Sequence, residues 1–551
     1  MAEILSADFS SATLEALFQE KLKKGDLIGA LLLTATMKAN GYKKEQLCLK
    51  RAKVFYKMKR YELAVEEWFK YLSVEADEKR HARAYNGLGA CFFGMGDKDL
   101  AGLYFEKQLR LNRNADYDYC DVTLKFYDEV LNRKNYYKIA YPYDKADFTE
   151  LLEECDEYLK IGYYDKCIEK LSIIPENSRF YVDRLISESV ANFLNENSER
   201  AVELIEKAHQ LSKNNVSVIC NAISIFTALK NKEKADYYFS LLNLDNLTES
   251  SNLYKVMMVS CEMQNHYLVN TLSTKYLKIF PYDLTALLVL GFSQYNLKEY
   301  KKAENTFKKC FQISSSPIHY YYYQVAEKAS NGNVEHQKLH YAFDVPKKIR
   351  KAFLKQATEL LMMPREEKIA SEKDIQTLAH YAFYAGIYEL QSSAVTLLGE
   401  LGTKTSVKTL KDALISINVF NTVKEGIIGY LVADGYEGEL PVVFASNYRK
   451  LKVYKANFKN QNEKLFVEAY SLTLSKVANA ENDLLPYKTS AENIYNKLSE
   501  KGLLSAVTDP YSLSATIYEL AGTAKIVSRR GFAKFFKANL KTIKQIKTLI
   551  E

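Results

Sequence analysis

Small or β-branched residues recur along this chain of 551 residues at a constant spacing of 34. The longest series of such positions consists of Cys167, Ala201, Ala235, Val269 and Ala303. An earlier series begins at Ala30, reaches Ala64 one such period later and Ala101 after a slightly longer step. A fixed period of this length indicates helical repeats, each of which buries its apolar face against the next. The chain is therefore expected to form an array of repeated helical units.

The positions around each small residue repeat as well. Four places later the residue is large and apolar in six of eight cases, in the series Thr34, Trp68, Phe105, Leu171, Ile205, Phe239, Ser273 and Phe307. Twelve places earlier it is small in five of seven cases, in the series Ala52, Gly89, Cys155, Ser189, Ile223, Met257 and Gly291. A small residue lets two helices approach closely, and a large residue one turn later fills the space against the next helix.

This pattern resembles the tetratricopeptide repeat, in which each unit of about 34 residues forms two antiparallel helices. The clearest unit reads Tyr85-x-x-Leu88-Gly89-x-x-Phe92, followed by Ala101-x-x-x-Phe105. The resemblance implies an all-α fold, a right-handed α-solenoid with about eight units within residues 1–346. The positions that define these repeats are Ala30, Ala64, Gly89, Ala101, Cys167, Ala201, Ala235, Gly291 and Ala303. The alternative is a set of amphipathic helices without a true repeat.

Four places depart from the pattern. Thr34 weakens the first unit, which is interpreted as an N-terminal cap, and Ser273 stands where an apolar residue is expected. Residues 113–147 lack the small-residue mark and are interpreted as a distorted unit or an insertion. After Ala303 the next mark would fall on Gln337, so the last unit is degenerate, and the array is expected to end at Val345-Pro346.

The period changes in residues 347–455. Gly399 and Gly429 each lie on an apolar helical pattern, and the step between them is shorter than the period of the array. The first of these helices is expected to begin near Tyr388. This stretch resembles the HEAT-type repeat, another helical pair. A plain helical extension of the solenoid is the alternative. Under either interpretation the region is expected to stay helical.

Residues 456–551 are predicted to form a small helical domain. Five helices are placed near 463–479, 488–502, 510–521, 528–537 and 540–550. Residues 491–495, 500–504 and 510–515 resemble the cyclin-like domain of general transcription initiation factors. The last two helices resemble a helix-turn-helix, with Ala533 and Phe536 as core residues and Ala538 after the turn. A glycine is usual in that turn, and Lys537 stands there instead.

The charge of the chain is concentrated at this end. The formal net charge is +8, and residues 525–550 contain eight basic residues and no acid. They are Lys525, Arg529, Arg530, Lys534, Lys537, Lys541, Lys544 and Lys547. From Arg529 onward they are candidate contacts to nucleic acid or to an acidic protein partner. The alternative is a solvated C-terminal helix, in which lysines are favoured by the helix dipole.

Motifs that carry chemistry are missing from the sequence. It contains no phosphate-binding loop, no dinucleotide fingerprint and no Gly-x-Ser-x-Gly nucleophile elbow. His336 and His340 share a helical face beside Glu335, but two imidazoles are too few for a metal site. The prediction is a non-enzymatic protein with no cofactor and no metal.

Composition indicates a cytoplasmic protein with no membrane segment. No run of about 18 uncharged apolar residues occurs, so no membrane-spanning helix is expected. The N-terminus also lacks the basic stretch followed by an apolar stretch that is typical of a signal peptide. The eight cysteines form no Cys-x-x-Cys pair, so they are interpreted as small buried apolar residues.

The predicted function follows from the repeat. In proteins resembling this family, the first helix of each unit lines a concave surface. The chain has 42 tyrosines, four of them consecutive from Tyr320 to Tyr323, which are interpreted as contacts on that surface or as core. The first hypothesis is therefore a protein-interaction scaffold that binds a peptide or protein partner on its concave face. The second is a regulator or assembly factor that contacts DNA or RNA through the basic C-terminal helices.

Overall fold

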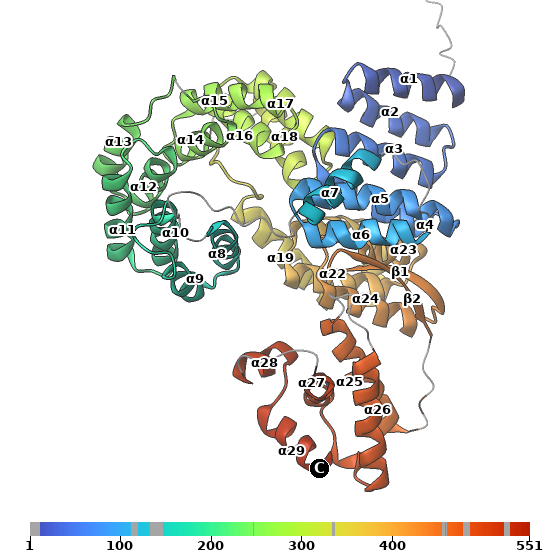
Figure 1. Ribbon diagram of the computed structural model, residues 1–551. Coiled ribbons are helices and arrows are strands. Elements are labelled where there is room, and N and C mark those ends of the chain that lie inside the picture. Colours follow the sequence, from blue (N-terminus) through green and yellow to red (C-terminus); the bar gives the residue numbers. More distant parts are fainter. Residues whose placement is uncertain are drawn as a thin grey trace, which may run out of the picture.

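The computed structural model describes residues 11–111, 119–132, 147–245, 247–332, 337–454, 458, 460–477, 485–522 and 529–550. Within these residues the fold is all-α apart from one short 3-10 helix and one β-hairpin. Figure 1 shows an arc of paired helices, a second helical layer beneath its N-terminal end, and a separate group of C-terminal helices. No helix in the described part of the chain is long and apolar enough to cross a membrane.

In each of eight helical pairs, the second helix contains one of the small or β-branched residues that recur along the sequence. We call this residue the mark of the pair, and its side chain is buried in every case. Three pairs precede residue 112: α1 (Ser11–Lys23) with α2 (Leu27–Ala39), α3 (Lys44–Lys57) with α4 (Tyr61–Val74), and α5 (Glu78–Met95) with α6 (Lys98–Leu111). Five pairs follow: α8 (Thr149–Ile161) with α9 (Tyr164–Leu171), α10 (Tyr181–Leu194) with α11 (Ser198–Leu211), α12 (Val216–Ala228) with α13 (Lys232–Ser240), α14 (Ser250–Glu262) with α15 (His266–Ile279), and α16 (Leu284–Asn296) with α17 (Tyr300–Ile313). A single helix, α7 (Cys120–Asn132), lies between the two groups, and α18 (Pro317–Ser330) follows the last pair.

The repeated offsets form a packing pair inside each hairpin. A Cβ atom added to Gly89 would lie 2.5 Å from the ring of Phe105, and one added to Gly291 would lie 2.5 Å from the ring of Phe307. The two partners have the same separation in both units, from twelve places before the small residue to four places after it. The glycine thus leaves room for the ring, and the aromatic residue fills it. The seven cysteines whose side chains are described are also buried and form no disulfide.

The turn inside each pair is a repeated element too. Five residues before each mark, the backbone is left-handed, with positive φ at Gly25, Lys59, Gly96, Gly162, Glu196, Lys230, Gln264 and Lys298. At Lys230, the next amide (Asn231 N) donates to the Phe226 carbonyl at 2.8 Å, and the Asn231 side chain accepts from Lys234 N at 3.1 Å. This arrangement closes one helix and caps the next.

Replacing Lys230 by glycine is expected to raise the free energy of unfolding by about 1 kcal/mol. Its φ of 59° strains an L-residue, whereas glycine adopts this conformation freely. The matched control is Lys308→Gly, at an exposed helical position of α17, which should lower stability by about 1 kcal/mol. Thermal and urea unfolding measure both variants. Equal effects of the two substitutions would contradict the turn assignment.

The array bends until its two ends touch. Tyr282 Oη donates to the Gly25 carbonyl at 3.2 Å, and Arg60 lies 3.7 Å from the carboxylate of Asp283. The ammonium of Lys59 lies 5.6 Å from the ring centroid of Phe280. The turns of the first two helical pairs therefore bind the loop between α15 and α16, and helices α2 and α17 are in contact.

The second layer has six helices and a hairpin. The helices are α19 (Lys347–Met362), α20 (Arg365–Ala370), α21 (Glu372–Ala385), α22 (Tyr388–Leu401), α23 (Lys404–Leu414) and α24 (Asn421–Ala433). Gly399 packs against Tyr430, since an added Cβ atom would lie 2.4 Å from that ring. Helix α22 begins at the expected Tyr388; the HEAT resemblance itself stays a prediction.

The prediction that residues 347–455 are helical throughout is wrong at their C-terminal end. Strands β1 (Gly438–Phe444) and β2 (Asn447–Val453) pair antiparallel, with Val442 opposite Arg449. The two turn residues, Ala445 and Ser446, both have positive φ, as a tight hairpin turn requires. Their sequence lacks the Asn-Gly or Asp-Gly pair that commonly marks such a turn.

Both faces of this hairpin are buried. Leu440, Val442 and Phe444 pack into the core of helices α19–α24, whereas Val443 and Tyr448 pack into the core of the N-terminal pairs. Tyr448 Oη donates to the Leu72 carbonyl at 2.7 Å, and Tyr448 N donates to Tyr104 Oη at 3.1 Å. The hairpin therefore joins the second layer to the N-terminal repeats.

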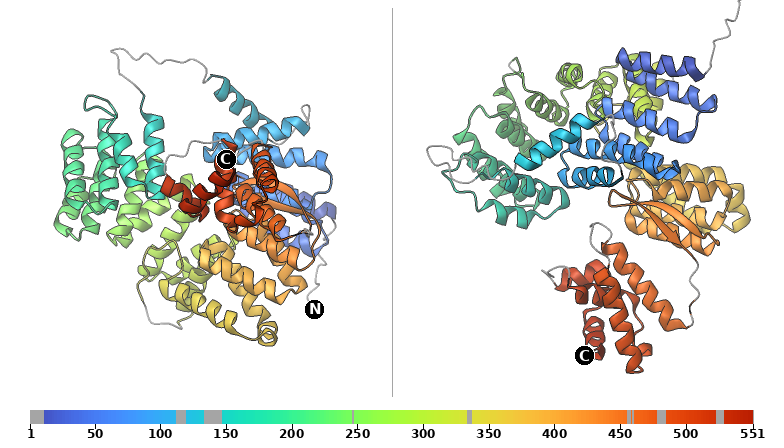
Figure 2. Two further views of the ribbon diagram at one scale, coloured as in Figure 1. Left: turned by 90° about the horizontal axis from the view of Figure 1, so that it is seen from below. Right: turned by 45° about the vertical axis from the view of Figure 1, so that its right-hand side comes forward.

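The five predicted C-terminal helices are confirmed. They are α25 (Gln461–Val477), α26 (Leu485–Glu500), α27 (Pro510–Ala521), α28 (Arg529–Phe536) and α29 (Leu540–Ile550). Helix α27 is central and contacts the other four, and its Ser514 hydroxyl lies 3.0 Å from that of Thr473 in α25. Figure 2 shows this group set apart from the arc. Its helix α25 contacts helix α24 of the second layer.

Candidate functional site

The first helices of the pairs form the inner side of the arc. Figure 1 shows α8, α10, α12, α14, α16 and α18 on this side, with the second helices outside them. Consecutive first helices contact one another from α8 through α10 and α12 to α14. We call the surface that these helices turn toward the centre of the arc the inner face.

On α10, α12 and α14 the inner face is polar and open. Its side chains include Asp183, Ser217, Asn221, Ser224, Lys255 and Glu262, all exposed or half-buried. Lys255 Nζ on α14 donates to Ser217 Oγ on α12 at 2.5 Å, a contact that links neighbouring repeats. Asn221 donates to the Ser217 carbonyl of its own helix at 2.8 Å.

The carboxyl groups on this face are perturbed by their surroundings. Desolvation by nearby protein atoms raises the pKa of Asp183, and the positive charge of Lys255 offsets part of this rise. Desolvation likewise raises the pKa of Glu262, and a hydrogen bond from Ser224 offsets part of this rise. Both carboxylates are exposed, so an incoming cationic group could pair with them.

On α16 the inner face is closed. Phe292 and Asn296 lie one repeat period after Met258 and Glu262, so they occupy equivalent positions. They are nevertheless buried, whereas Met258 is half-buried and Glu262 exposed. The cover is the chain's own segment 337–345: Asn296 donates to the Leu339 carbonyl and accepts from Leu339 N, both at 2.8 Å.

The tyrosine run divides between core and surface. Tyr322 is buried against Phe292 and Phe307, with ring centroids 4.6 and 5.7 Å away. Tyr320 is 46% exposed. One helical face of the run thus fills the core, and the other faces solvent.

The basic C-terminal residues whose side chains are described differ in their surroundings. Lys534, Lys537, Lys541 and Lys544 are exposed, whereas Lys547 forms an ion pair with Glu519 at 2.6 Å. Arg529 and Arg530 open α28, and Lys525 lies outside the described residues.

The last two helices follow the predicted helix-turn-helix pattern in part. Ala533, Phe536 and Ile543 are buried, and Lys537 has a φ of 54°, so it occupies the turn position usual for glycine. Ala538 N donates to the Ala533 carbonyl at 2.8 Å, which closes α28.

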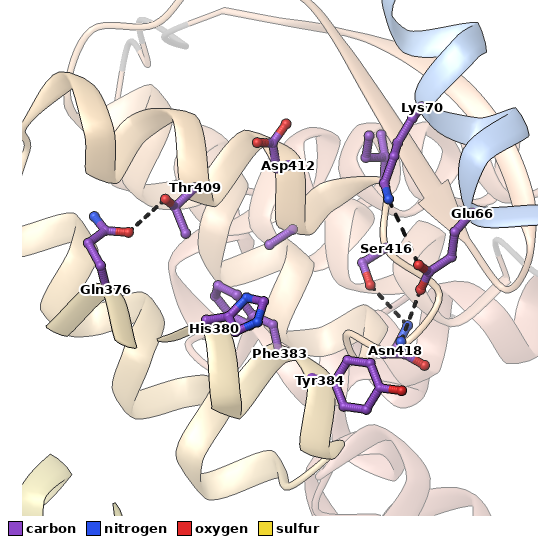
Figure 3. Close-up of a pocket in the computed structure, with 12 residues that line it drawn as sticks. Glu66, Lys70, Gln376, His380, Phe383, Tyr384, Thr409, Asp412, Ser416 and Asn418 are labelled. Carbon is purple, nitrogen blue, oxygen red and sulfur yellow. Dashed lines mark hydrogen bonds and ion pairs between the residues drawn. The ribbon is translucent and has the colours of Figure 1, made fainter. Parts of the chain in front are cut away.

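A pocket of about 340 Å³ lies where the N-terminal repeats meet the second layer. Figure 3 shows Glu66 and Lys70 from α4 facing His380 and Tyr384 of α21 and Asn418 of the loop after α23. Asn418 Nδ2 donates to Glu66 at 3.0 Å, and burial raises the pKa of that carboxyl. Sequence reasoning missed this pocket, because more than 300 residues separate its two walls.

The pocket is lined by polar and ionisable groups from both layers. Within the described parts of the chain, no group of three or more His, Cys, Asp or Glu side chains could hold a metal ion. Glu335 and His336, two of the three residues weighed for a metal, lie outside those parts. The contacts across the pocket hold the two layers together.

Comparison with known proteins places two segments in a sequence family. The model of the tetratricopeptide repeat matches residues 82–114, which cover most of α5 and all of α6, and residues 284–317, which include α16 and α17. No curated protein matches the sequence.

Solved structures that match the chain include a tetratricopeptide repeat protein from Parabacteroides merdae, at 14% identity over 52% of this chain and 98% of that one, with a TM-score of 0.29. The TPR2AB domain of yeast Sti1, in complex with pHSP90, is 16% identical over 48% of this chain and 97% of its own, with a TM-score of 0.20. The Naa15/Naa10 structure bound to HypK-THB is 11% identical over 98% of this chain and 78% of that chain, with a TM-score of 0.21.

Proposed function

We propose that this protein, whose chain is built from tetratricopeptide repeats, is a non-enzymatic cytoplasmic scaffold that binds a protein or peptide partner on its inner face. The observation that carries the proposal is the open polar surface on α10, α12 and α14. There, side chains from successive repeats contact one another, as Lys255 of α14 and Ser217 of α12 do. A long surface of this kind suits an extended or helical ligand better than a small substrate.

The charges on this surface favour a partner with both signs of charge. Asp183 and Glu262 present carboxylates on α10 and α14, and Lys255 lies between them in sequence, exposed on α14. Because charge complementarity contributes mainly to specificity and association rate, reversing these charges should weaken the cognate partner selectively.

The double variant Asp183→Arg/Glu262→Arg is expected to reduce recovery of the partner at least about tenfold, since like charges placed opposite one another across an interface cost several kcal/mol. The measurement is affinity capture from native extract with quantitative mass spectrometry, followed by titration of the purified partner. The matched control is Glu199→Arg/Glu233→Arg, which makes the same charge change at exposed positions of the outer helices α11 and α13. Equal loss with both double variants, or no loss with either, would refute binding on the inner face.

The nucleic-acid alternative is tested in the same experiment. Lys534, Lys537, Lys541 and Lys544 are exposed on α28, α29 and the turn between them, which supports contact with phosphates. Changing Lys541 and Lys544 to Glu leaves the Lys547–Glu519 ion pair in place. If partners are lost with this variant and with nuclease, but not with the inner-face variant, the protein is instead a nucleic-acid regulator or assembly factor.

A further inference from the structure

The segment 337–345, which contains no helix or strand, lies against the inner face of the array. Leu339 and Tyr341 are half-buried, whereas Lys338 and His340, which alternate with them, are exposed. This alternation is that of a strand laid against a surface. Among the described residues the segment has no strand partner, and its main chain bonds to side chains of the repeats.

Asn296 binds the main chain of this segment through both halves of its amide. Its Nδ2 donates to the Leu339 carbonyl and its Oδ1 accepts from Leu339 N, each at 2.8 Å. The same two bonds could hold any extended peptide, because they involve only the peptide backbone. Farther along the segment, Tyr322 Oη donates to the Asp344 carbonyl at 3.2 Å.

Tyr341 supplies side-chain recognition. Its ring lies 5.9 Å from that of Phe292, edge to face, and its hydroxyl lies 2.9 Å from His266 Nδ1. Phe292 belongs to α16 and His266 begins α15, so one aromatic side chain bridges two neighbouring repeats. Side-chain recognition and main-chain bonding together constitute the usual means of holding an extended ligand.

We propose that residues 337–345 are a tethered occupant of the inner face at α16, α18 and the start of α15, and that this part of the surface takes an extended peptide with the pattern Leu-x-Tyr. The proposal rests on the proposed function, because it assigns a ligand class and a regulation to the same face. The tethered segment has an effective concentration of order millimolar, so a partner must compete with it. Release of the segment opens this part of the face.

The first experiment measures binding of a labelled peptide with the sequence of residues 337–345 by fluorescence anisotropy. The variant Leu339→Gly/Tyr341→Gly, in the full chain, should bind this peptide at least about tenfold more tightly than the wild type does, because its own segment competes less. Adding Asn296→Ala in that background should weaken binding at least about tenfold. Adding Asn40→Ala instead should leave binding unchanged, since this amide donates to the Thr36 carbonyl of α2, away from the inner face.

Equal affinity of wild type and double-glycine variant would overturn the proposal, and so would an affinity that Asn296→Ala leaves unchanged. A peptide with alanine in place of its tyrosine must bind more weakly; equal binding would refute the Leu-x-Tyr pattern.

Hydrogen exchange of the unmodified segment gives a second test that does not need the double-glycine variant to fold. The amide of Leu339 should exchange at least about tenfold faster in Asn296→Ala than in the wild type or in Asn40→Ala. An unchanged rate would also overturn the proposal. If the peptide fails to bind while Asp183→Arg/Glu262→Arg still loses the partner, the tethered occupant is refuted and the scaffold function stands.

Discussion

The stability of the wild-type protein is expected to rise by about 2 kcal/mol between pH 7 and pH 9, relative to that of the Lys424→Met variant. Lys424 lies on α24 with 1% of its surface exposed, and its ammonium donates to the Val443 carbonyl of the hairpin. Burial lowers the pKa of this lysine from 10.5 to about 7. Met has a similar length and no charge, so the comparison isolates this group.

The sign follows from proton binding. Between pH 7 and about 10.5 the unfolded chain holds a proton on Lys424 that the folded chain has lost. Folding is therefore penalised most below pH 7, and the penalty disappears as the pH rises through the unfolded pKa. Each pH unit in this window changes the stability by about 1.4 kcal/mol at most.

Urea unfolding at pH 6, 7, 8 and 9 measures this difference. Lys408→Met, at an exposed position of α23, is the matched control and should track the wild type at every pH. A stability difference between wild type and Lys424→Met that does not change with pH would show that Lys424 remains solvated, and that the hairpin does not cover it.

The variant Gly291→Ala should lower the free energy of unfolding by about 2 kcal/mol, although alanine is the better helix former. The new methyl group would lie 2.5 Å from the ring of Phe307, which is fully buried and also packs on Phe292 and Tyr322. The ring cannot turn away without displacing these neighbours.

Gly426→Ala is the control with the opposite sign. Gly426 lies in α24, and a Cβ atom added there has nothing within 4 Å. This variant should be more stable than the wild type by about 1 kcal/mol, because only the helix propensity changes. Urea and thermal unfolding measure both variants. A stabilising effect at Gly291 would mean that the two helices of this pair are not packed as the repeat requires.

The sequence was most informative about local pairs. Gly291 and Phe307 belong to one helical pair, so the contact between them depends only on one turn and on two helices of ordinary length. The left-handed turn residue before each mark is equally local, which is why its position recurs even where the residue is Lys or Glu. The C-terminal helices were placed for the same reason, from apolar periodicity and breakers within each segment.

The inner face was predicted only in outline. The repeat register indicates which helices face inward, but Asn296 was not singled out, because nothing local distinguishes it from other helical asparagines. Asn296 occupies the same repeat position as Glu262, one period earlier. This equivalence is the sequence signal that could have identified Asn296 as a residue of the inner face. That it binds Leu339, in a segment beyond the next helix, depends on how the chain returns after α18.

By itself, then, the sequence determined the repeat, its helical pairs and the packing inside each pair, because these contacts join residues within one period. Only the tertiary structure decided that the arc closes on itself at Arg60 and Asp283, and that the hairpin joins two cores through Tyr448. Such contacts connect residues more than 200 positions apart. They depend on the overall curvature of the array. Small rotations between neighbouring repeats add up to this curvature, and no single repeat encodes it.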